Sequence, residues 1–249
     1  MSTGLQASSP PYDQAFYDEQ FAGSQGSARV LLGLLAAHLQ PASVVDVGCG
    51  RGSWLSVWGE FGVQRLVGID GPWNRQELMA NPTIEFRATN LEQPLSLEER
   101  FDLAMSIEVV EHLSPSAGEA VVESLTRLSD VVVFSAAFSG QGGVDHIHER
   151  YHSHWGALFR DRGYVAYDAF RPQLWSDERV MPWHRANVFL FLRRGHALAT
   201  AGWPELVDLG FMDCVHPWLY ERTRGANMGF MNHARALFPS LVHALRRRL

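Results

Sequence analysis

The sequence has few cysteines and no long apolar run. Only Cys49 and Cys214 occur among 249 residues, which argues against a disulfide framework and predicts a reducing compartment. No stretch of eighteen apolar residues is present, so we expect no membrane-spanning helix. The first residues also lack a basic start followed by an apolar stretch, so no secretory signal is visible and we expect a cytoplasmic protein.

Positive charge is also in short supply. The 21 Lys and Arg residues stand against 27 Asp and Glu residues, which leaves a formal charge of −6. Because a mildly acidic chain has no overall electrostatic attraction to nucleic acid, a nucleic-acid partner is not expected. Hydrophobic residues make up 46% of the chain, which is enough to bury a full core and argues against general disorder.

Short apolar runs alternate with helical patterns along most of the chain. Helices are predicted at residues 12–40, 53–61, 116–128 and 152–162, and strands at residues 43–47, 65–70, 83–87, 101–107, 131–135, 163–170 and 187–193. The first five runs are nearly continuously apolar, as in strands covered on both faces. This alternation predicts an α/β fold: a Rossmann-like, mostly parallel seven-stranded sheet with helices on both faces. The long loop before the last run predicts an antiparallel final hairpin.

Three segments are predicted along the chain. Residues 1–40 form an N-terminal helical cap, residues 41–194 the core domain and residues 195–249 a C-terminal helical extension. The extension is rich in aromatic residues and ends with leucines at helical spacing, at positions 241, 245 and 249. Such a stripe predicts a helix packed on the domain, with a dimer contact or an anionic-surface contact as alternatives.

The clearest motif joins a buried strand to a glycine-rich turn and a helix. It occupies residues 44–52 and reads Val-Val-Asp-Val-Gly-Cys-Gly-Arg-Gly. Glycines allow a sharp turn and leave room for a ligand near the backbone, while the helix that begins at Ser53 presents free N–H groups to anionic groups. Asp70, at the end of the next strand, can accept both hydroxyls of an adenosine ribose. The motif therefore predicts a nucleotide-type cofactor site.

This motif resembles the first motif of the class I S-adenosylmethionine-dependent methyltransferases, which have an acidic residue two positions before the first glycine. The resemblance covers about residues 40–194. It implies that S-adenosylmethionine is the cofactor and that S-adenosylhomocysteine is released. It also implies that the glycine turn lies under the methionine moiety, and that two aspartates hold the amino group and the ribose. The residues concerned are Gly48, Cys49, Gly50, Asp46 and Asp70.

Further cofactor positions follow from the same resemblance. An aromatic residue just after the ribose-binding aspartate usually packs on adenine. Asn90 stands where the family often has Asp, and its carbonyl can still accept a hydrogen bond from the adenine amino group. The segment at the end of the fourth strand passes beside the methionine and the transferred methyl group. The positions implied in this way are Gly71, Trp73, Asn90, Leu91, Ser106 and Ile107.

Acidic residues and histidines follow the fourth and fifth predicted strands. Glu108, Glu111 and His112 would share one face if this turn is helical, at the carboxyl end of the sheet where α/β proteins bind ligands. His146 follows a glycine-rich lip at residues 139–143 that is suited to approach a ligand or to open.

Three interpretations of these four residues are open. In the first, His112 or His146 is a general base that deprotonates an acceptor hydroxyl. In the second, all four bind a divalent metal, either a transition metal or Mg²⁺ with added water, which lowers the pKa of a bound hydroxyl. In the third, Glu111 and His112 are structural, because the same pair is common in small-molecule methyltransferases without a metal.

Two narrower resemblances bear on the substrate. The Glu-x-x-Glu-His run at residues 108–112 is similar to small-RNA terminal ribose methyltransferases, which use a metal. Residues 134–149 with Trp155 resemble a bacterial subgroup found with carbohydrate or natural-product genes, although His148 replaces its usual Asn. We therefore expect O-methylation of a small molecule, a sugar or secondary metabolite, with His146 or His112 as base. The alternatives are metal-dependent RNA 3′-terminal ribose 2′-O-methylation and a cofactor-binding regulatory protein without turnover.

Overall fold

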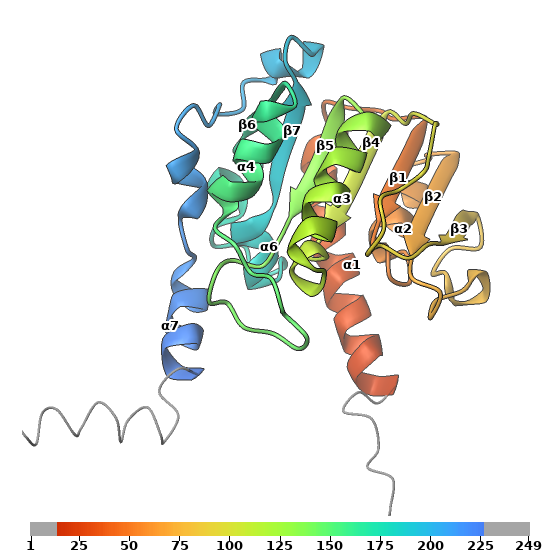
Figure 1. The fold of residues 1–249 in the computed structure, drawn as a ribbon, viewed down its shortest axis with the longest axis horizontal. Coiled ribbons are helices and arrows are strands. Elements are labelled where there is room, and N and C mark those ends of the chain that lie inside the picture. The colour runs from red at the N-terminus through yellow and green to blue at the C-terminus, as the bar shows by residue number, and fades with distance from the viewer. Residues whose placement is uncertain (1–13, 227–249) are drawn as a thin grey trace, which may run out of the picture.

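Seven strands form one sheet in the computed structural model, which describes residues 14–226 (Figure 1). Their order across the sheet is β3-β2-β1-β4-β5-β7-β6. Strands β1 to β5 pair in parallel, whereas β7 is antiparallel to both β5 and β6, so the predicted sheet and its antiparallel final pair are confirmed. The strands are β1 (Ser43–Val47), β2 (Arg65–Asp70), β3 (Ile84–Ala88), β4 (Leu103–Ile107), β5 (Val131–Ser135), β6 (Tyr164–Tyr167) and β7 (Phe189–Arg193).

Helices cover both faces of this sheet, as Figure 1 shows. On one face, fully buried Leu55 and Trp58 belong to the core between the helices and the strands, and on the other face Trp155 and Phe159 do the same. Burial of both faces explains why the central strands are apolar along their whole length. The helices are α1 (Gln14–Ala36) and α2 (Ser53–Glu60) on the first face, and α3 (Pro115–Leu128) and α4 (His152–Asp161) on the second.

Two details differ from the expectations. Strand β3 is an edge strand in which only Ile84 is buried, so it is not covered on both faces. The connection between β6 and β7 contains two short helices, α5 (Arg171–Leu174) and α6 (Pro182–Asn187), where a loop was expected. Each has a proline in its first turn, and both are too short to show a helical period in the sequence.

The chain after β7 returns to the carboxyl end of the sheet. Arg171 donates hydrogen bonds to the carbonyls of a 3₁₀ turn (Leu209–Asp213), and the Asp213 carboxylate accepts from the backbone N–H and the hydroxyl of Ser153. These contacts lead the chain into α7 (Pro217–Ala226), which lies next to the β5–α4 loop. The predicted leucine stripe at residues 241–249 lies outside the described residues.

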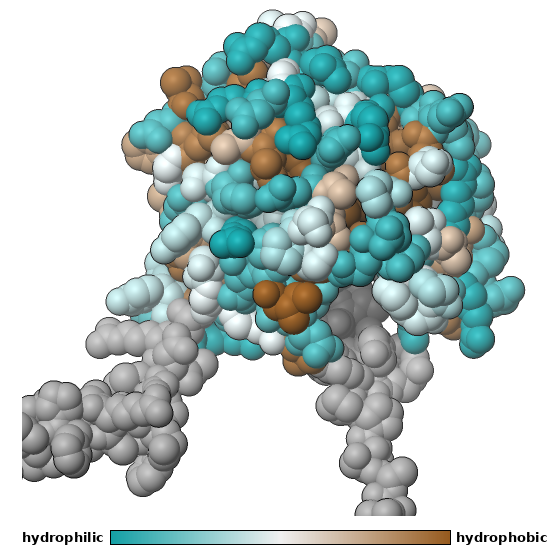
Figure 2. Space-filling view, viewed as in Figure 1, coloured by the Kyte–Doolittle hydropathy of each residue, from teal (hydrophilic) through white to brown (hydrophobic). Residues whose placement is uncertain are grey.

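The described surface on the side of α3 and α4 is mixed in character. Figure 2 shows its hydrophobic side chains in separate patches among polar ones. In the β5–α4 loop, the large apolar or aromatic side chains of Val144, Ile147 and Tyr151 are exposed. Within residues 14–226, no helix has the length and apolar character needed to cross a bilayer.

Candidate active site

A cavity of about 1000 Å³ opens at the carboxyl ends of β1 and β4, where the strand order reverses. Parallel α/β sheets bind their ligands at such a switch point. The glycine turn, the segment after β4, the β5–α4 loop, α6 and α7 all contribute to its wall. The predicted site residues that line it are Asp46, Gly48, Cys49, Gly50, Trp73, Ile107, Glu108, Glu111, His112 and His146. The cavity thus unites the predicted cofactor loop with all four predicted catalytic residues.

The glycines of the turn serve different purposes. Gly48 has φ +81°, and a Cβ atom there would lie 2.3 Å from Cγ2 of Val109, so this glycine is required by packing. Its N–H and that of Cys49 both donate to the carbonyl of Ile69. Gly50 also has a positive φ, but a Cβ atom there would meet nothing within 4 Å. Gly50 therefore leaves open space at the cavity wall for a ligand.

Asp70 braces the glycine turn. Its carboxylate accepts hydrogen bonds from the backbone N–H of Gly50 and of Gly71, both at 2.6 Å. Burial raises the pKa of Asp70, and these two N–H groups oppose the shift. The carboxylate is not part of the cavity wall, yet each oxygen keeps a lone pair for a further donor. The sequence predicts a ribose contact for Asp70 but carries no signal for these hydrogen bonds to the turn.

Asp46 is buried beside the turn with one carboxylate oxygen, Oδ1, that has no hydrogen-bond partner. Burial raises its pKa to about 7, with a further contribution from the negative charge of Asp70. A buried carboxylate without a partner is costly, and a cationic group of a ligand would relieve that cost.

This raised pKa predicts a pH-dependent gain in stability for Asp46→Asn. The folded pKa of about 7 lies above the ordinary value of 3.8. Protonated Asp46 therefore makes its full contribution to the free energy of unfolding below about pH 4, and this contribution is lost as the pH rises through 7. The amide cannot ionise, so the variant should gain about 1–3 kcal/mol relative to the natural chain between pH 4.5 and pH 8. Urea unfolding at both pH values measures this change. The prediction fails if the difference in free energy of unfolding between the two proteins is the same at pH 4.5 and pH 8.

The residues predicted to contact adenine differ in their position relative to the cavity. Trp73 is 74% exposed and folds back over Gly71, where a Cβ atom would lie 1.9 Å from Cη2 of the indole. Gly71 thus allows Trp73 to reach the cavity wall. Asn90 lies outside that wall, and its Oδ1 accepts a hydrogen bond from the backbone N–H of Glu92.

Two other predicted cofactor residues are buried and do not line the cavity. Leu91 is buried in the hydrophobic core beside α3. Ser106 is fully buried in β4, and its hydroxyl has no hydrogen-bond partner. The next residue, Ile107, reaches the cavity.

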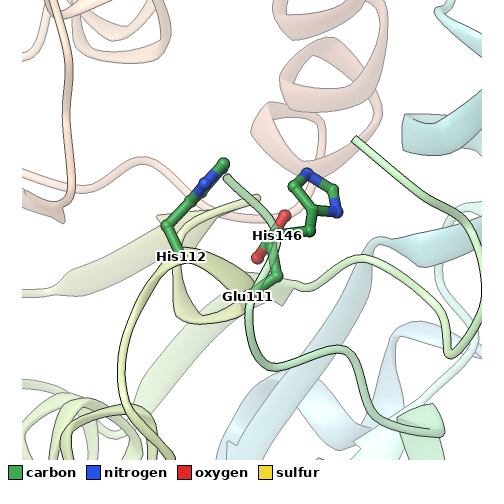
Figure 3. Close-up of side chains that lie close together, drawn as sticks. All are labelled: Glu111, His112 and His146. Carbon is green, nitrogen blue, oxygen red and sulfur yellow. The ribbon is translucent and has the colours of Figure 1, made fainter. Parts of the chain in front are cut away.

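Glu111, His112 and His146 form a compact cluster (Figure 3). One potential ligand atom from each residue lies within 4.8 Å of the others. The two imidazole rings are perpendicular, with centroids 4.8 Å apart. Glu111 and His112 come from a 3₁₀ turn (Val110–His112), and His146 comes from the β5–α4 loop.

The cluster is electrostatically unusual. Glu111 is 1% exposed, and neither of its carboxylate oxygens has a well-aligned hydrogen-bond partner. Burial raises its pKa well above the ordinary range, and the charge of Glu108 adds to this effect, although nearby backbone N–H groups oppose it. Burial and the neighbouring His146 lower the pKa of His112. Such shifts are typical of functional sites.

Glu108 stands apart from this cluster. It has φ +54°, and the 3₁₀ turn begins only at Val110, so the expected shared helical face is wrong. The side-chain amide of Asn187 donates to both carboxylate oxygens of Glu108, at 3.2 and 3.3 Å, and Gln141 lies at 3.5 Å. These amides hold Glu108 at the cavity wall.

Three polar residues of this site have no role that the sequence predicts. Asn187 begins the last predicted strand, and its separation of 79 residues from Glu108 gives no local signal. Gln141 lies within the glycine-rich segment 139–143, whose sequence predicts only a loop near the ligand. Glu149 hydrogen-bonds to His146, and the three-residue spacing of this pair was a signal that could have revealed it.

Comparisons with known proteins agree with this geometry. Residues 25–189 match the model of a methyltransferase domain family, whereas no curated protein matches the sequence. One similar fold is CalS10, an amino pentose methyltransferase from Micromonospora echinaspora involved in calicheamicin biosynthesis. The identity is 16%, the TM-score is 0.53, and the match covers 75% of this chain and 100% of that one.

Two further solved structures share the fold. Magnesium protoporphyrin IX methyltransferase from Synechocystis PCC 6803, with bound S-adenosylhomocysteine, is 17% identical with a TM-score of 0.50, covering 75% of this chain and 90% of that one. The methyltransferase domain of a bacterial Hen1 protein is 16% identical with a TM-score of 0.50, covering 68% and 98%. Such identities show the fold alone. Because the family model spans more than half of the sequence, the chain belongs to the methyltransferase domain family.

Proposed function

We propose that this methyltransferase transfers a methyl group from S-adenosylmethionine to a hydroxyl group of a small molecule. One observation carries the proposal: a single cavity of about 1000 Å³ is lined both by the glycine turn and by the Glu111–His112–His146 cluster. A cofactor and an acceptor of moderate size can therefore meet in one cavity.

The residues around the glycine turn fit this cofactor. Asp46, with its unpartnered buried oxygen, would hold the cationic amino group, and the open space at Gly50 would receive the methionine moiety. Asp70 would accept the ribose hydroxyls with its remaining lone pairs, and Trp73 would cover adenine. The cofactor supplies an electrophilic methyl group when it is bound.

The chain's own contribution to the reaction is alignment and proton removal. The cavity walls orient the acceptor oxygen and exclude water. His146 takes the proton of the acceptor hydroxyl as the oxygen bonds to the methyl carbon; the carbon–sulfur bond of the cofactor would break at the same time and release S-adenosylhomocysteine. Glu108, held by the amide of Asn187, is placed to accept a hydrogen bond from a second hydroxyl of the acceptor.

The rest of the cavity wall favours a sugar or a ring-containing metabolite. Trp183 and Arg222 line it, and the Trp183 indole lies 6.4 Å from that of Trp218. Trp203, by contrast, packs on the core, and Trp175 contacts His216. CalS10, which has the same fold, is an amino pentose methyltransferase, so this fold accommodates an acceptor of the proposed class.

A specific observation favours a second candidate, metal-assisted methylation. The close approach of Glu111, His112 and His146 offers three ligands, and a cation would compensate the buried Glu111 carboxylate, which has no well-aligned hydrogen-bond partner. The metal would lower the pKa of an acceptor hydroxyl, as in ribose methylation at an RNA 3′ end. We rank it second because both carboxylate oxygens of Glu108, the fourth predicted ligand, already accept hydrogen bonds from Asn187, and Glu108 is not among the three clustered ligand residues.

Metal analysis combined with turnover separates the two candidates. We expect purified protein to contain little bound metal and to methylate members of a panel of sugars and natural-product phenols in the presence of EDTA. His146→Ala should lower turnover about 100-fold and leave S-adenosylhomocysteine affinity within about twofold. Stoichiometric metal that disappears in Glu111→Ala would instead support the metal candidate. Tight cofactor binding without turnover on any acceptor or RNA would favour a regulatory protein.

A further inference from the structure

The Glu149 carboxylate makes three hydrogen bonds at the mouth of the cavity. Oε1 lies 2.8 Å from Nδ1 of His146 and accepts from the backbone N–H of Gly142 at 2.7 Å. Oε2 accepts from the backbone N–H of Gly140 at 2.8 Å. The Glu149 side chain is only 15% exposed, and its contact with His146 is partly buried, whereas the two contacts with the loop backbone lie at the surface.

The loop that Glu149 holds is built for close contact with His146. Gly140 and Gly142 have φ values of +87° and +68°, a conformation that favours glycine. At Gly143, a Cβ atom would lie 2.3 Å from Nε2 of the His146 ring, so only glycine lets the imidazole pack against this loop. The loop lines the main cavity and also faces Leu219 of α7.

We propose that Glu149 is a positioning residue that sets both the tautomer of His146 and the conformation of loop 140–143. This inference rests on the proposed function, in which His146 is the base. A carboxylate accepts a hydrogen bond from Nδ1–H, so Nδ1 carries the proton of the neutral ring and Nε2 keeps the lone pair. Nε2 is then the nitrogen that takes the acceptor's proton.

The Glu149 side chain thereby connects His146 to loop 140–143. If the loop moves away, Glu149 loses two of its three donors, and its hold on His146 weakens. The loop and the base are therefore ordered together. A residue that only stabilised the loop would leave the tautomer of His146 unchanged.

Two substitutions separate these roles. Glu149→Gln keeps one acceptor oxygen, which can serve His146 and Gly142, but it turns an N–H group toward the N–H of Gly140. Glu149→Ala removes all three contacts. We expect amide exchange of Gly140 to accelerate about tenfold or more in both variants. The Nδ1–H tautomer of His146 should persist in the glutamine variant and be lost in the alanine variant.

Amide exchange and long-range proton–nitrogen NMR spectra at pH 8 measure these effects without an acceptor. Glu98→Gln, at an exposed position before β4, is the matched control and should change neither. An unchanged His146 tautomer in Glu149→Ala, or unchanged Gly140 exchange in both variants, would overturn the proposal. S-adenosylhomocysteine affinity should stay within about twofold of the natural chain. Absence of binding in every protein would refute the proposed function while leaving the NMR result interpretable.

Discussion

Gly48→Ala should lower the unfolding temperature by about 5–15 °C. The added methyl group would lie 2.3 Å from Cγ2 of Val109 on a backbone with φ +81°. Overpacking and the left-handed conformation together cost about 2–5 kcal/mol. Because Gly48 lines the cavity, S-adenosylhomocysteine binding should weaken as well. Calorimetric melting and titration measure the two effects.

The chain offers a matched control for this substitution. Gly62 has φ +90°, but a Cβ atom there meets nothing within 4 Å, so Gly62→Ala should cost only about 1 kcal/mol for the backbone conformation. Adding Val109→Ala to the Gly48 variant removes the clashing methyl groups and should restore part of the stability. Equal melting temperatures for the two glycine variants would show that the contact with Val109 does not matter.

Asp70→Ala should weaken S-adenosylhomocysteine binding about 100-fold. Two effects combine: the ribose loses a charged acceptor, and the N–H groups of Gly50 and Gly71 lose the carboxylate that braces the turn. Hydrogen bonds to a charged group contribute about 1.5–3 kcal/mol each, which is enough for a loss of this size. Asp70→Asn, which keeps one acceptor oxygen, should show an intermediate affinity. Isothermal titration at fixed pH provides the comparison.

Asp102→Ala controls for a general loss of stability. Its carboxylate accepts from the backbone N–H groups of Ala42 and Ser43, at the opposite end of β1 from the cavity. This variant should therefore lose stability without losing affinity. The ribose assignment fails if Asp70→Ala and Asp102→Ala bind S-adenosylhomocysteine equally well.

The fold was predictable because its determinants are local. The strands that became β1 and β2 agree with the predicted boundaries, since each is a short apolar run ended by a glycine or an acidic residue. The motif of residues 44–52 likewise placed the turn at the correct edge of the sheet. The exposure of β3 was not predictable in this way, because an edge position depends on the order of the strands.

The site was predictable only in part for the same reason. The sequence offered Glu111, His112 and His146 as candidates with three open interpretations, and all three line the cavity. It did not reveal that Glu108 turns toward Asn187, since that contact joins residues 79 positions apart. It also missed the bracing of the turn by Asp70, because backbone donors leave no mark in the sequence.

The central claim is that the cavity beside the glycine turn binds the cofactor of a methyltransferase. Calorimetric titration of the natural chain with S-adenosylhomocysteine tests this claim most directly. We predict saturable one-to-one binding that persists in EDTA and is weakened by Asp70→Ala but not by Asp102→Ala. Absence of binding by a folded protein, or equal binding by all three proteins, would contradict it.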